Sequence, residues 1–457
     1  MKRTNDLGHD PVFRLVCKLA IPTMLAQLVS VLYSIVDRIY IGNIPQIGDL
    51  ALAGVGVCGP IVTLLSSFAS LVGLGGSPIL AMRMGEGNQK EASRVLSNSF
   101  FMLLVLSVGL TGLFLAMKGL LLQWFGASQA TFGYADTYLT IYTAGTFFAL
   151  MATGMNSFLI AQGFSGLGMA TVMLGAVLNI VLDPVFIFVL KLDVAGAALA
   201  TVLSQLASCV YVLCVLFGRS VQVRIGFGGY SLKLIGRILI TGISPFLIIF
   251  VDSVMIISMN AVLQSYGGAE LGDRLITCAT IAQSFMLVVT MPLGGISGGT
   301  QTILAFNYGA HRRDRILQAE KHIALLCVGY TALMFALARL GGGLFVRLFT
   351  TEPELAAEAL DAIRICTLAV IPLGIQYAIV DGFTGMAQVK LALPLSAFRK
   401  VVYFAALFWL PAAFGARAVF YAEPVSDVLG PIASVIIYAV FIKKILDFPA
   451  APRHHEG

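Results

Sequence analysis

Charged side chains are scarce in this sequence: Asp, Glu, Lys and Arg make up 11% of its 457 residues, whereas 58% of the residues are hydrophobic. The mean hydropathy is +0.91. Roughly 25% of the residues of a soluble domain are charged, so this composition excludes an ordinary water-soluble protein. We predict a polytopic membrane protein embedded in a lipid bilayer.

Enzyme motifs are absent as well. The sequence contains no P-loop, H-E-x-x-H motif, nucleophile elbow or Gly-rich dinucleotide turn where it could act. This argues against an enzyme, and against ATP as the source of energy. The seven cysteines form no C-x-x-C pair, so we expect neither a disulfide framework nor a structural metal or other cofactor.

Long apolar runs fill most of the chain. A membrane-spanning helix needs about 20 mainly apolar residues, and polar breaks divide the sequence into twelve such runs. The predicted spans are 15–41, 51–80, 95–117, 133–155, 161–190, 195–218, 234–264, 274–305, 322–343, 360–383, 391–414 and 425–446. The first run is too long, and too polar at Asp37 and Arg38, for a cleaved signal peptide, so we expect it to be retained.

The loops differ in positive charge. With the two ends and the even-numbered loops assigned to one side, that side holds nineteen Lys and Arg residues and the other side holds six. Cytoplasmic loops carry the excess of Lys and Arg, which places both termini in the cytoplasm and the protein in the inner membrane. The net charge of +6 thus follows from topology, and we expect no nucleic-acid partner.

The sequence contains an internal repeat. Pro22 precedes Asp37 by fifteen residues, and Pro245 precedes Asn260 by the same interval, 223 residues later. The stretches GGSPILAMRMG and GTQTILAFNYG continue this register at a shift of 224. An even number of spans in each repeat gives two halves of the same orientation, and the substrate path in such folds lies between them near the midplane.

We therefore predict an N-lobe over 1–218, a cytoplasmic linker over 219–233 and a C-lobe over 234–457. Each lobe would hold six transmembrane helices. The fold class is all-α. We expect a monomer.

The most informative stretch is LGAVLNIVLDPVFIFV, which places Asn179 and Asp183 in an otherwise apolar helix. Residues four apart share one face of a helix, and Pro184 leaves the carbonyl one turn earlier without its usual partner. An ionisable group at the bilayer centre costs roughly 2.5 to 3.5 kcal/mol, and such groups mark ion or proton pathways. This pattern predicts a polar pocket in the fifth span.

Several motifs resemble the multidrug and toxic compound extrusion (MATE) family. They are LAIPTMLAQLVSVLYSIVDRIYIG, LNIVLDPVFIF, MNAVLQSYGG, AFNYGAHRRD and AEPVSD. The similarity runs from about residue 12 to residue 446 and is greatest to the bacterial DinF-like and MepA-like branch. The resemblance implies a V-shaped bundle of twelve helices in two pseudo-symmetric lobes that exports organic, often cationic, compounds in exchange for H⁺ or Na⁺.

The resemblance also implies a cation-coupling site in the N-lobe. The matching residues are Asp37 in SIVDRIYIG, Asn156 in GMNSFLIAQG, Asn179 and Asp183 in LNIVLDP, and Thr201 in ALATVLSQ. Carboxylate, amide and hydroxyl oxygens suit Na⁺ or a shared proton, so Asp37, Asn179 and Asp183 are the candidate Na⁺ ligands. A buried Asn or Thr is also often only a hydrogen-bonding link between helices.

Further polar and flexible residues are candidates for the substrate cavity. Asp252 and Asp381 are membrane acids of the C-lobe that would attract organic cations, and we expect Arg399 to pair with Asp381. The remaining candidates for the cavity surface are Gln27, Tyr33, Gln283, Met286 and Phe158, for which lipid-facing or packing roles are equally open.

Two other transport classes compete with an antiporter. A channel needs a continuous polar pore, which isolated buried acids in a two-lobe repeat do not supply. A flippase for lipid-linked precursors in the same superfamily handles anionic substrates and needs a basic cavity. Four membrane acids, Asp37, Asp183, Asp252 and Asp381, favour a cationic or neutral substrate instead.

Overall fold

The computed structural model describes residues 6–125, 127, 129–350 and 352–447, and every regular element in these ranges is a helix. The first half consists of α1 (Val12–Gly42), α2 (Gly48–Gly85), α3 (Gln89–Trp124), α4 (Phe132–Ala144), α5 (Thr146–Ala161), α6 (Ser165–Pro184), the π-helix η1 (Val185–Val189) and α7 (Asp193–Phe217). The second half consists of α8 (Leu232–Gly309), α9 (Arg313–Leu340), α10 (Gly342–Val346), α11 (Pro353–Cys366), α12 (Val370–Gly385), α13 (Val389–Phe414), the 3₁₀-helix η2 (Ala416–Tyr421) and α14 (Ala422–Ile445).

Ten segments of the described chain are long and apolar enough to cross a membrane, and two bent helix pairs raise the number to twelve. This agrees with the twelve predicted spans. The predicted run 133–155 is broken at Gly145, where α4 and α5 meet at 56°, and the run 360–383 is broken between α11 and α12 at 46°. A side chain at Gly145 would collide with Val202 of α7, so glycine allows α7 to pack closely against this bend.

Two of these segments lie within the single element α8, namely Leu232–Gly267 and Arg274–Gly309. Its beginning and its end both touch the second part of α2, because Ile238 lies against Gly75 and Gly309 lies against Met82. The chain therefore reverses direction within α8.

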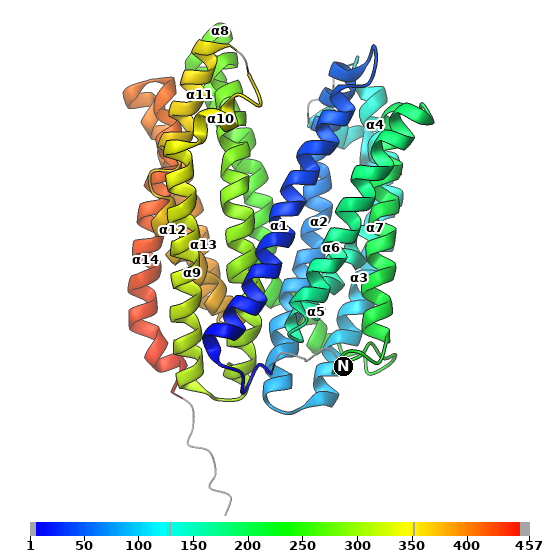
Figure 1. The fold of residues 1–457 in the computed structure, drawn as a ribbon, viewed down its shortest axis with the longest axis vertical. Coiled ribbons are helices and arrows are strands. Elements are labelled where there is room, and N and C mark those ends of the chain that lie inside the picture. The colour runs from blue at the N-terminus through cyan, green and yellow to red at the C-terminus, as the bar shows by residue number, and fades with distance from the viewer. Residues whose placement is uncertain (1–5, 126, 128, 351, 448–457) are drawn as a thin grey trace, which may run out of the picture.

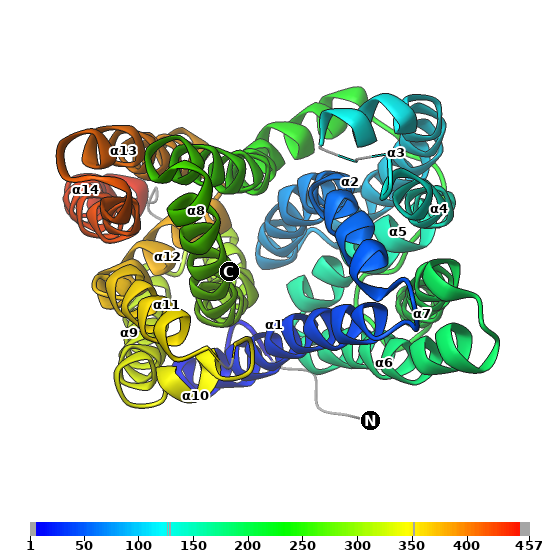
Figure 2. The ribbon, with the colours of Figure 1, turned by 90° about the horizontal axis from the view of Figure 1, so that it is seen from above.

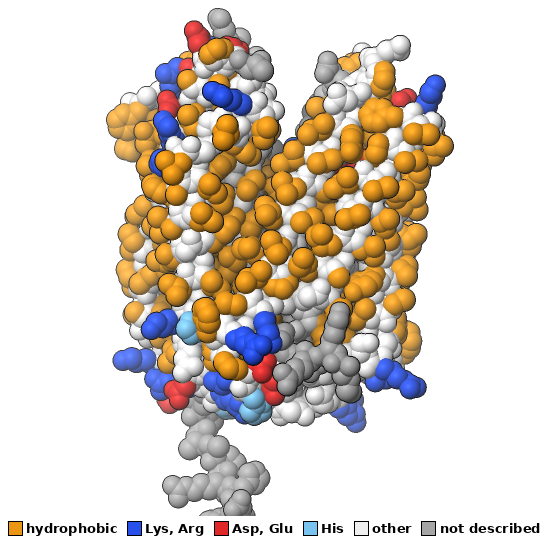
Figure 3. All heavy atoms as spheres, in the orientation of Figure 1, with side chains coloured by type: hydrophobic (Ala, Val, Ile, Leu, Met, Phe, Trp, Pro, Cys, Tyr) orange, Lys and Arg blue, Asp and Glu red, His pale blue; other side chains and the backbone are white. Residues whose placement is uncertain are grey.

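The two halves form separate bundles that meet at one end and diverge toward the other (Figures 1 and 2). Figure 3 shows the notch between them at the top, an apolar outer surface, and Lys and Arg at both ends, with more of them at the lower end. Each bundle has its own hydrophobic core. The predicted V-shaped, two-lobed architecture is confirmed.

Helix α1 crosses from one bundle to the other (Figure 1). Leu15 and Leu19, in its first half, belong to the core of the second bundle together with Ile316 and Ile323. Ile41, at its other end, belongs to the core of the first bundle. A change in the packing of α1 therefore acts on both bundles.

The closed lower end contains a reciprocal contact between the repeats. Gly85 faces the Phe306 carbonyl, and Gly309 faces the Met82 carbonyl. These two pairs are related by the shift of 224 residues that the sequence repeat predicts. A Cβ atom at either glycine would lie far inside 3.0 Å of the opposing oxygen, so only glycine permits this approach of α2 and α8.

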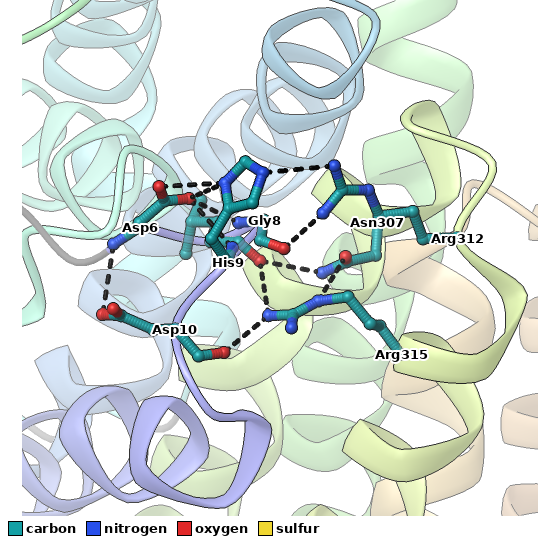
Figure 4. Close-up of polar contacts among 8 residues, drawn as sticks. Asp6, Gly8, His9, Asp10, Asn307, Arg312 and Arg315 are labelled. Carbon is teal, nitrogen blue, oxygen red and sulfur yellow. Dashed lines mark hydrogen bonds and ion pairs between the residues drawn. The ribbon is translucent and has the colours of Figure 1, made fainter.

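The segment before α1 also closes this end (Figure 4). The Arg315 guanidinium donates hydrogen bonds to the Leu7 carbonyl at 3.2 Å and the Asp10 carbonyl at 2.8 Å. The amide of Asn307 donates to the Leu7 carbonyl at 3.1 Å, and Arg312 donates to the Gly8 carbonyl. Side chains of the second half thus hold the backbone that leads into α1.

The predicted linker 219–233 contains the non-helical segment between α7 and α8. Val221, Val223 and Ile225 alternate inward and join the first core, while Gln222 and Arg224 point outward. The Val223 amide donates to Gln162 at 2.8 Å. The first part of the linker is therefore anchored to the first half.

Candidate functional site

A cavity of about 630 Å³ lies between the two halves. Its wall is formed by α1, α2, α5, α6 and α7 of the first half and by α8, α12 and α13 of the second half. The wall residues of the first half are uncharged, and their polar members carry hydroxyl or amide groups. These polar members are Thr23, Gln27, Ser30, Tyr33, Ser70, Ser77, Thr153, Asn156, Ser157, Thr171, Asn179, Thr201, Ser204, Gln205 and Ser208.

A pair of carboxyl groups lies directly behind this wall. Asp183 of α6 is fully buried, and its carboxyl group is within hydrogen-bonding reach of that of Asp37 on α1. The Asn179 amide donates to Asp183 Oδ1 at 3.1 Å and lies 3.4 Å from the Thr201 hydroxyl of α7. Because Asn179 and Thr201 also line the cavity, they connect the carboxyl pair to the space where a substrate would bind.

The local structure of α6 follows from its sequence. Asn179 and Asp183 are four residues apart and therefore share a helix face. Pro184 cannot donate a backbone hydrogen bond, and the chain continues as the π-helix η1, in which the Leu190 amide bonds to the Val185 carbonyl at 2.9 Å. The helix is therefore irregular directly after the Asn179–Asp183 pair.

Several acceptor oxygens at this site have no hydrogen-bond partner among the described residues although they are buried. They are Asp37 Oδ1, Asn179 Oδ1, Asp183 Oδ2 and Asn156 Oδ1. Buried polar atoms are nearly always satisfied in native proteins. Unpaired acceptors on Asp37, Asn179 and Asp183 fit a bound proton or a hard cation such as Na⁺, which prefers oxygen ligands.

Tyrosine side chains surround the carboxyl pair. Tyr33 lies within electrostatic reach of both Asp37 and Asp183, and the Tyr138 hydroxyl bonds to Thr201. The sequence analysis did not identify Tyr138, because a tyrosine in the apolar stretch DTYLTIYTAG reads equally well as packing. Its position on α4, opposite α7, depends on how these two helices pack in the folded chain.

The predicted residues divide into groups. Four of the five predicted coupling residues come together as described, namely Asp37, Asn179, Asp183 and Thr201. The fifth, Asn156, lies in the cavity wall with its carbonyl oxygen against Gly168. No described contact joins Asn156 to the carboxyl pair. Of the cavity candidates, Asp252, Asp381, Gln27 and Tyr33 line the cavity.

The remaining cavity candidates lie elsewhere. Gln283 donates to Met259 Sδ at 3.5 Å, Met286 is buried in the second core and Phe158 is buried in the first core. None of these three is among the residues that form the described cavity wall.

The charged residues of the wall come from the second half, and they are Asp252, Asp381, Arg399 and Lys400. Asp381 accepts a hydrogen bond from Ser297, and Lys400 pairs with Asp252. We expected from the sequence that Arg399 pairs with Asp381, and this prediction was wrong. Arg399 forms an ion pair of 2.7 Å with Asp427 of α14.

The partner of Arg399 was missed because α13 and α14 meet only in the folded chain. Glu423 lies 4.0 Å from the Arg399 guanidinium, and the Asp427 side chain is 0% exposed. A signal was present in the sequence, since both acids belong to the motif AEPVSD at the start of an apolar helix. A buried Arg needs a buried acid close by.

No group of three or more His, Cys, Asp or Glu side chains able to hold a metal ion occurs among the residues that the structure describes. The site offers two carboxyl groups supplemented by amide and hydroxyl oxygens.

The chain resembles several known proteins. A family model described as MatE matches residues 22–185 and 249–409. The multidrug export protein MepA of Staphylococcus haemolyticus (strain JCSC1435) is 24% identical over 447 residues, 96% of each chain. MepA of Staphylococcus aureus (strain MSSA476) is 23% identical over 435 residues, 94% of each chain.

Solved structures show the same fold. One described as the outward-facing conformation of a multidrug resistance MATE family transporter superimposes with a TM-score of 0.90 at 23% identity, over 97% of this chain and 99% of the other. A transporter of the MOP superfamily from Pyrococcus furiosus, whose binding pocket is described as having reverse polarity, has a TM-score of 0.90 at 22% identity, over 98% of this chain and 100% of the other.

Proposed function

Because the chain belongs to the MatE family of transporters, we propose that it exports organic compounds across the cytoplasmic membrane in exchange for H⁺ or Na⁺. The observation that carries this proposal is the Asp37–Asp183 pair, which is linked through Asn179 to a cavity between two lobes. The MepA proteins named above are described as multidrug exporters, which supports drugs or toxic compounds as cargo.

The charge distribution supports an outward-open state. More Lys and Arg lie at the end where the lobes meet than at the open end (Figure 3), and the cytoplasmic side of a membrane protein carries the excess of these residues. The closed end would then face the cytoplasm, together with the first turn of α1 and the last turn of α14. The cavity would open to the outside, as in the structural neighbour described as outward-facing.

The carboxyl pair supports coupling to a cation. Two ionised carboxylates in contact within a low-dielectric environment repel each other strongly, so binding of one proton or one Na⁺ relieves the repulsion. A proton or Na⁺ on Asp183 would weaken the hydrogen bond that this carboxyl group accepts from Asn179, because an acceptor with less negative charge binds its donor less strongly. The Asn179 side chain also lines the cavity, so a change at the carboxyl pair would reach the surface that binds the substrate.

The position of α1 supports alternating access. This helix carries Asp37 and packs in both cores, so a change at the carboxyl pair is transmitted to both lobes. Ion entry from outside would favour release of the substrate, and the return to an inward-open state would deliver the ion to the cytoplasm. The differential affinity of the two states for the ion sets the size of this shift.

Gradient-driven transport in proteoliposomes tests the proposal. Efflux of a fluorescent organic cation is measured under an imposed H⁺ gradient and, separately, under an imposed Na⁺ gradient. We expect one gradient to drive transport by the wild type, and Asp37→Asn and Asp183→Asn to abolish it. Asp361→Asn is the matched control, because that carboxylate is 72% exposed and lies away from the cavity wall.

The alternative of a lipid-linked precursor flippase has one supporting observation, the presence of Arg399 and Lys400 in the cavity wall. Both bases are paired with carboxylates, which leaves no uncompensated basic surface for a pyrophosphate. If folded wild-type protein moves no organic cation under either gradient but translocates a lipid-linked pyrophosphate, this alternative replaces the antiporter.

A further inference from the structure

The cavity wall is electrically asymmetric. Its first-half residues are uncharged, and its second-half residues include two acids and two bases, Asp252, Asp381, Arg399 and Lys400. Their formal charges at neutral pH sum to zero. A wall of this kind differs from the acidic surface that the sequence led us to expect, and it offers partners for charges of both signs.

Two of these groups are fixed in place by partners outside the wall. Arg399 has a side chain that is 12% exposed, and it is paired at 2.7 Å with Asp427, which is 0% exposed. Glu423 lies 4.0 Å from the same guanidinium. Separating such a pair would leave a charge buried without a counter-ion, so Arg399 is a structural part of the wall and not a group that a ligand can recruit.

The Lys400–Asp252 pair is different. It joins α13 to the first span of α8, and Lys400 is 9% exposed whereas Asp252 is 47% exposed. No second acid is paired with Lys400 among the described ion pairs. Because half of the Asp252 side chain already faces the cavity, its carboxylate can be solvated or bound by another cation when it leaves Lys400.

We propose that the Lys400–Asp252 pair is a substrate subsite for zwitterionic compounds, that is, compounds bearing one carboxylate and one cationic group. This inference rests on the proposed function and specifies the substrate class of its cavity. The carboxylate of the substrate forms an ion pair with the Lys400 ammonium, and the cationic group of the substrate forms an ion pair with the Asp252 carboxylate. One ion pair within the protein is exchanged for two between protein and substrate.

Charge balance explains why both signs are needed. A substrate with only a cationic group would draw Asp252 away from Lys400 and leave a nearly buried ammonium unpaired, which is unfavourable. A substrate with only a carboxylate would leave Asp252 without a cation. A zwitterion satisfies both groups. Ser396, one helical turn before Lys400, and Tyr377 also line the cavity and offer hydroxyl groups to such a ligand.

Binding of a matched dye pair tests the subsite. One dye is a rhodamine with a free carboxylate, and the other is its methyl ester, which keeps the cation and lacks the anion. Affinities are measured by fluorescence polarisation on detergent-solubilised protein, so the result does not depend on whether transport occurs. We expect Lys400→Gln to weaken binding of the free acid by about tenfold or more, as for a truncated charge pair, and to leave the affinity of the ester unchanged or higher, because Asp252 no longer has to leave Lys400 to meet the cation.

For Asp252→Asn we expect the ratio of acid affinity to ester affinity to change in the opposite direction. The substitution frees Lys400 for the carboxylate and removes the partner of the cation, so this ratio should rise, whereas in Lys400→Gln it should fall. Lys444→Gln is the matched control, because Lys444 is exposed at the end of α14. Equal changes for both dyes in both variants would overturn the proposal and leave the pair as a link between α8 and α13.

The outcomes separate this inference from the proposed function. If wild-type protein transports the ester under a gradient but the acid-to-ester ratio is the same in all variants, the antiporter stands and the subsite is wrong. If neither dye is transported but the ratios cross as expected, the subsite stands and the antiporter is wrong. The charge-swapped variant Asp252→Lys with Lys400→Asp keeps the pair intact and should retain the fold and both affinities.

Discussion

A single methyl group at the closed end should shift the balance between outward-open and inward-open states. In Gly309→Ala, the new Cβ would lie well inside 3.0 Å of the Met82 carbonyl oxygen. The two helices must therefore separate on the order of 1 Å, and overpacking of this kind costs roughly 1 to 3 kcal/mol. The cost applies only while the end is closed.

That energy translates into a population change. A difference of about 1 to 3 kcal/mol between two states shifts their ratio about 5- to 150-fold. Gly85→Ala should have the same effect, because its Cβ would meet the Phe306 carbonyl in the reciprocal contact. Gly236→Ala is the control on the same helix α8, since a Cβ there has no neighbour within 4 Å.

The assay is a distance measurement between spin labels across the closed end. Labels at Lys90→Cys and Arg313→Cys occupy exposed positions of the first and second halves, in a background where the exposed Cys214 is replaced by Ser. We expect Gly309→Ala to add a population at longer distance. A distribution identical to that of Gly236→Ala would refute the view that this glycine contact holds the end closed.

Two further perturbations test the polar contacts. Arg399→Met should lower the free energy of unfolding by about 3 to 5 kcal/mol, because it leaves a buried carboxylate without a counter-ion. Adding Asp427→Asn, which neutralises the partner at 2.7 Å, should restore part of the thermal stability. No recovery in the double variant would contradict this. Burial acts against ionisation of Asp6, but hydrogen bonds from Gly8 and His9 hold the pKa of this exposed carboxyl below its ordinary value. A depressed folded pKa contributes stability above the unfolded pKa that is lost as pH falls through the folded value. The hydrogen-exchange protection factors of residues 6–12, which correct for the slower intrinsic exchange in acid, should therefore fall at low pH, and Asp6→Asn should show the lower protection already at neutral pH. Unchanged protection in either case would contradict the role of Asp6.

The sequence predicted the architecture well because its signals are local and repeated. Apolar runs near the length of a bilayer predicted twelve spans, and the shift of 224 residues predicted the two-lobed fold and the equivalence of Gly85 and Gly309 in the two repeats. The proximity of Asn179 to Asp183 followed from helical spacing alone. These features depend on one helix, or on one repeat compared with the other.

Features that depend on contacts between helices were predicted less well. The close packing of Gly145 against Val202 involves α7, and the partner of Arg399 comes from α14. Neither spacing nor composition identifies which neighbouring helix supplies a contact. For the same reason the neutral balance of charges in the cavity wall emerged only from the folded chain.

The central claim is that the Asp37–Asp183 pair couples an ion gradient to substrate movement. The most direct measurement compares substrate counterflow with gradient-driven uphill transport in the same proteoliposomes carrying Asp183→Asn. We predict that exchange of labelled for unlabelled substrate continues, because the cavity wall is unchanged, while accumulation driven by the H⁺ or Na⁺ gradient disappears. Uphill transport at the wild-type rate in folded Asp183→Asn protein would contradict the claim.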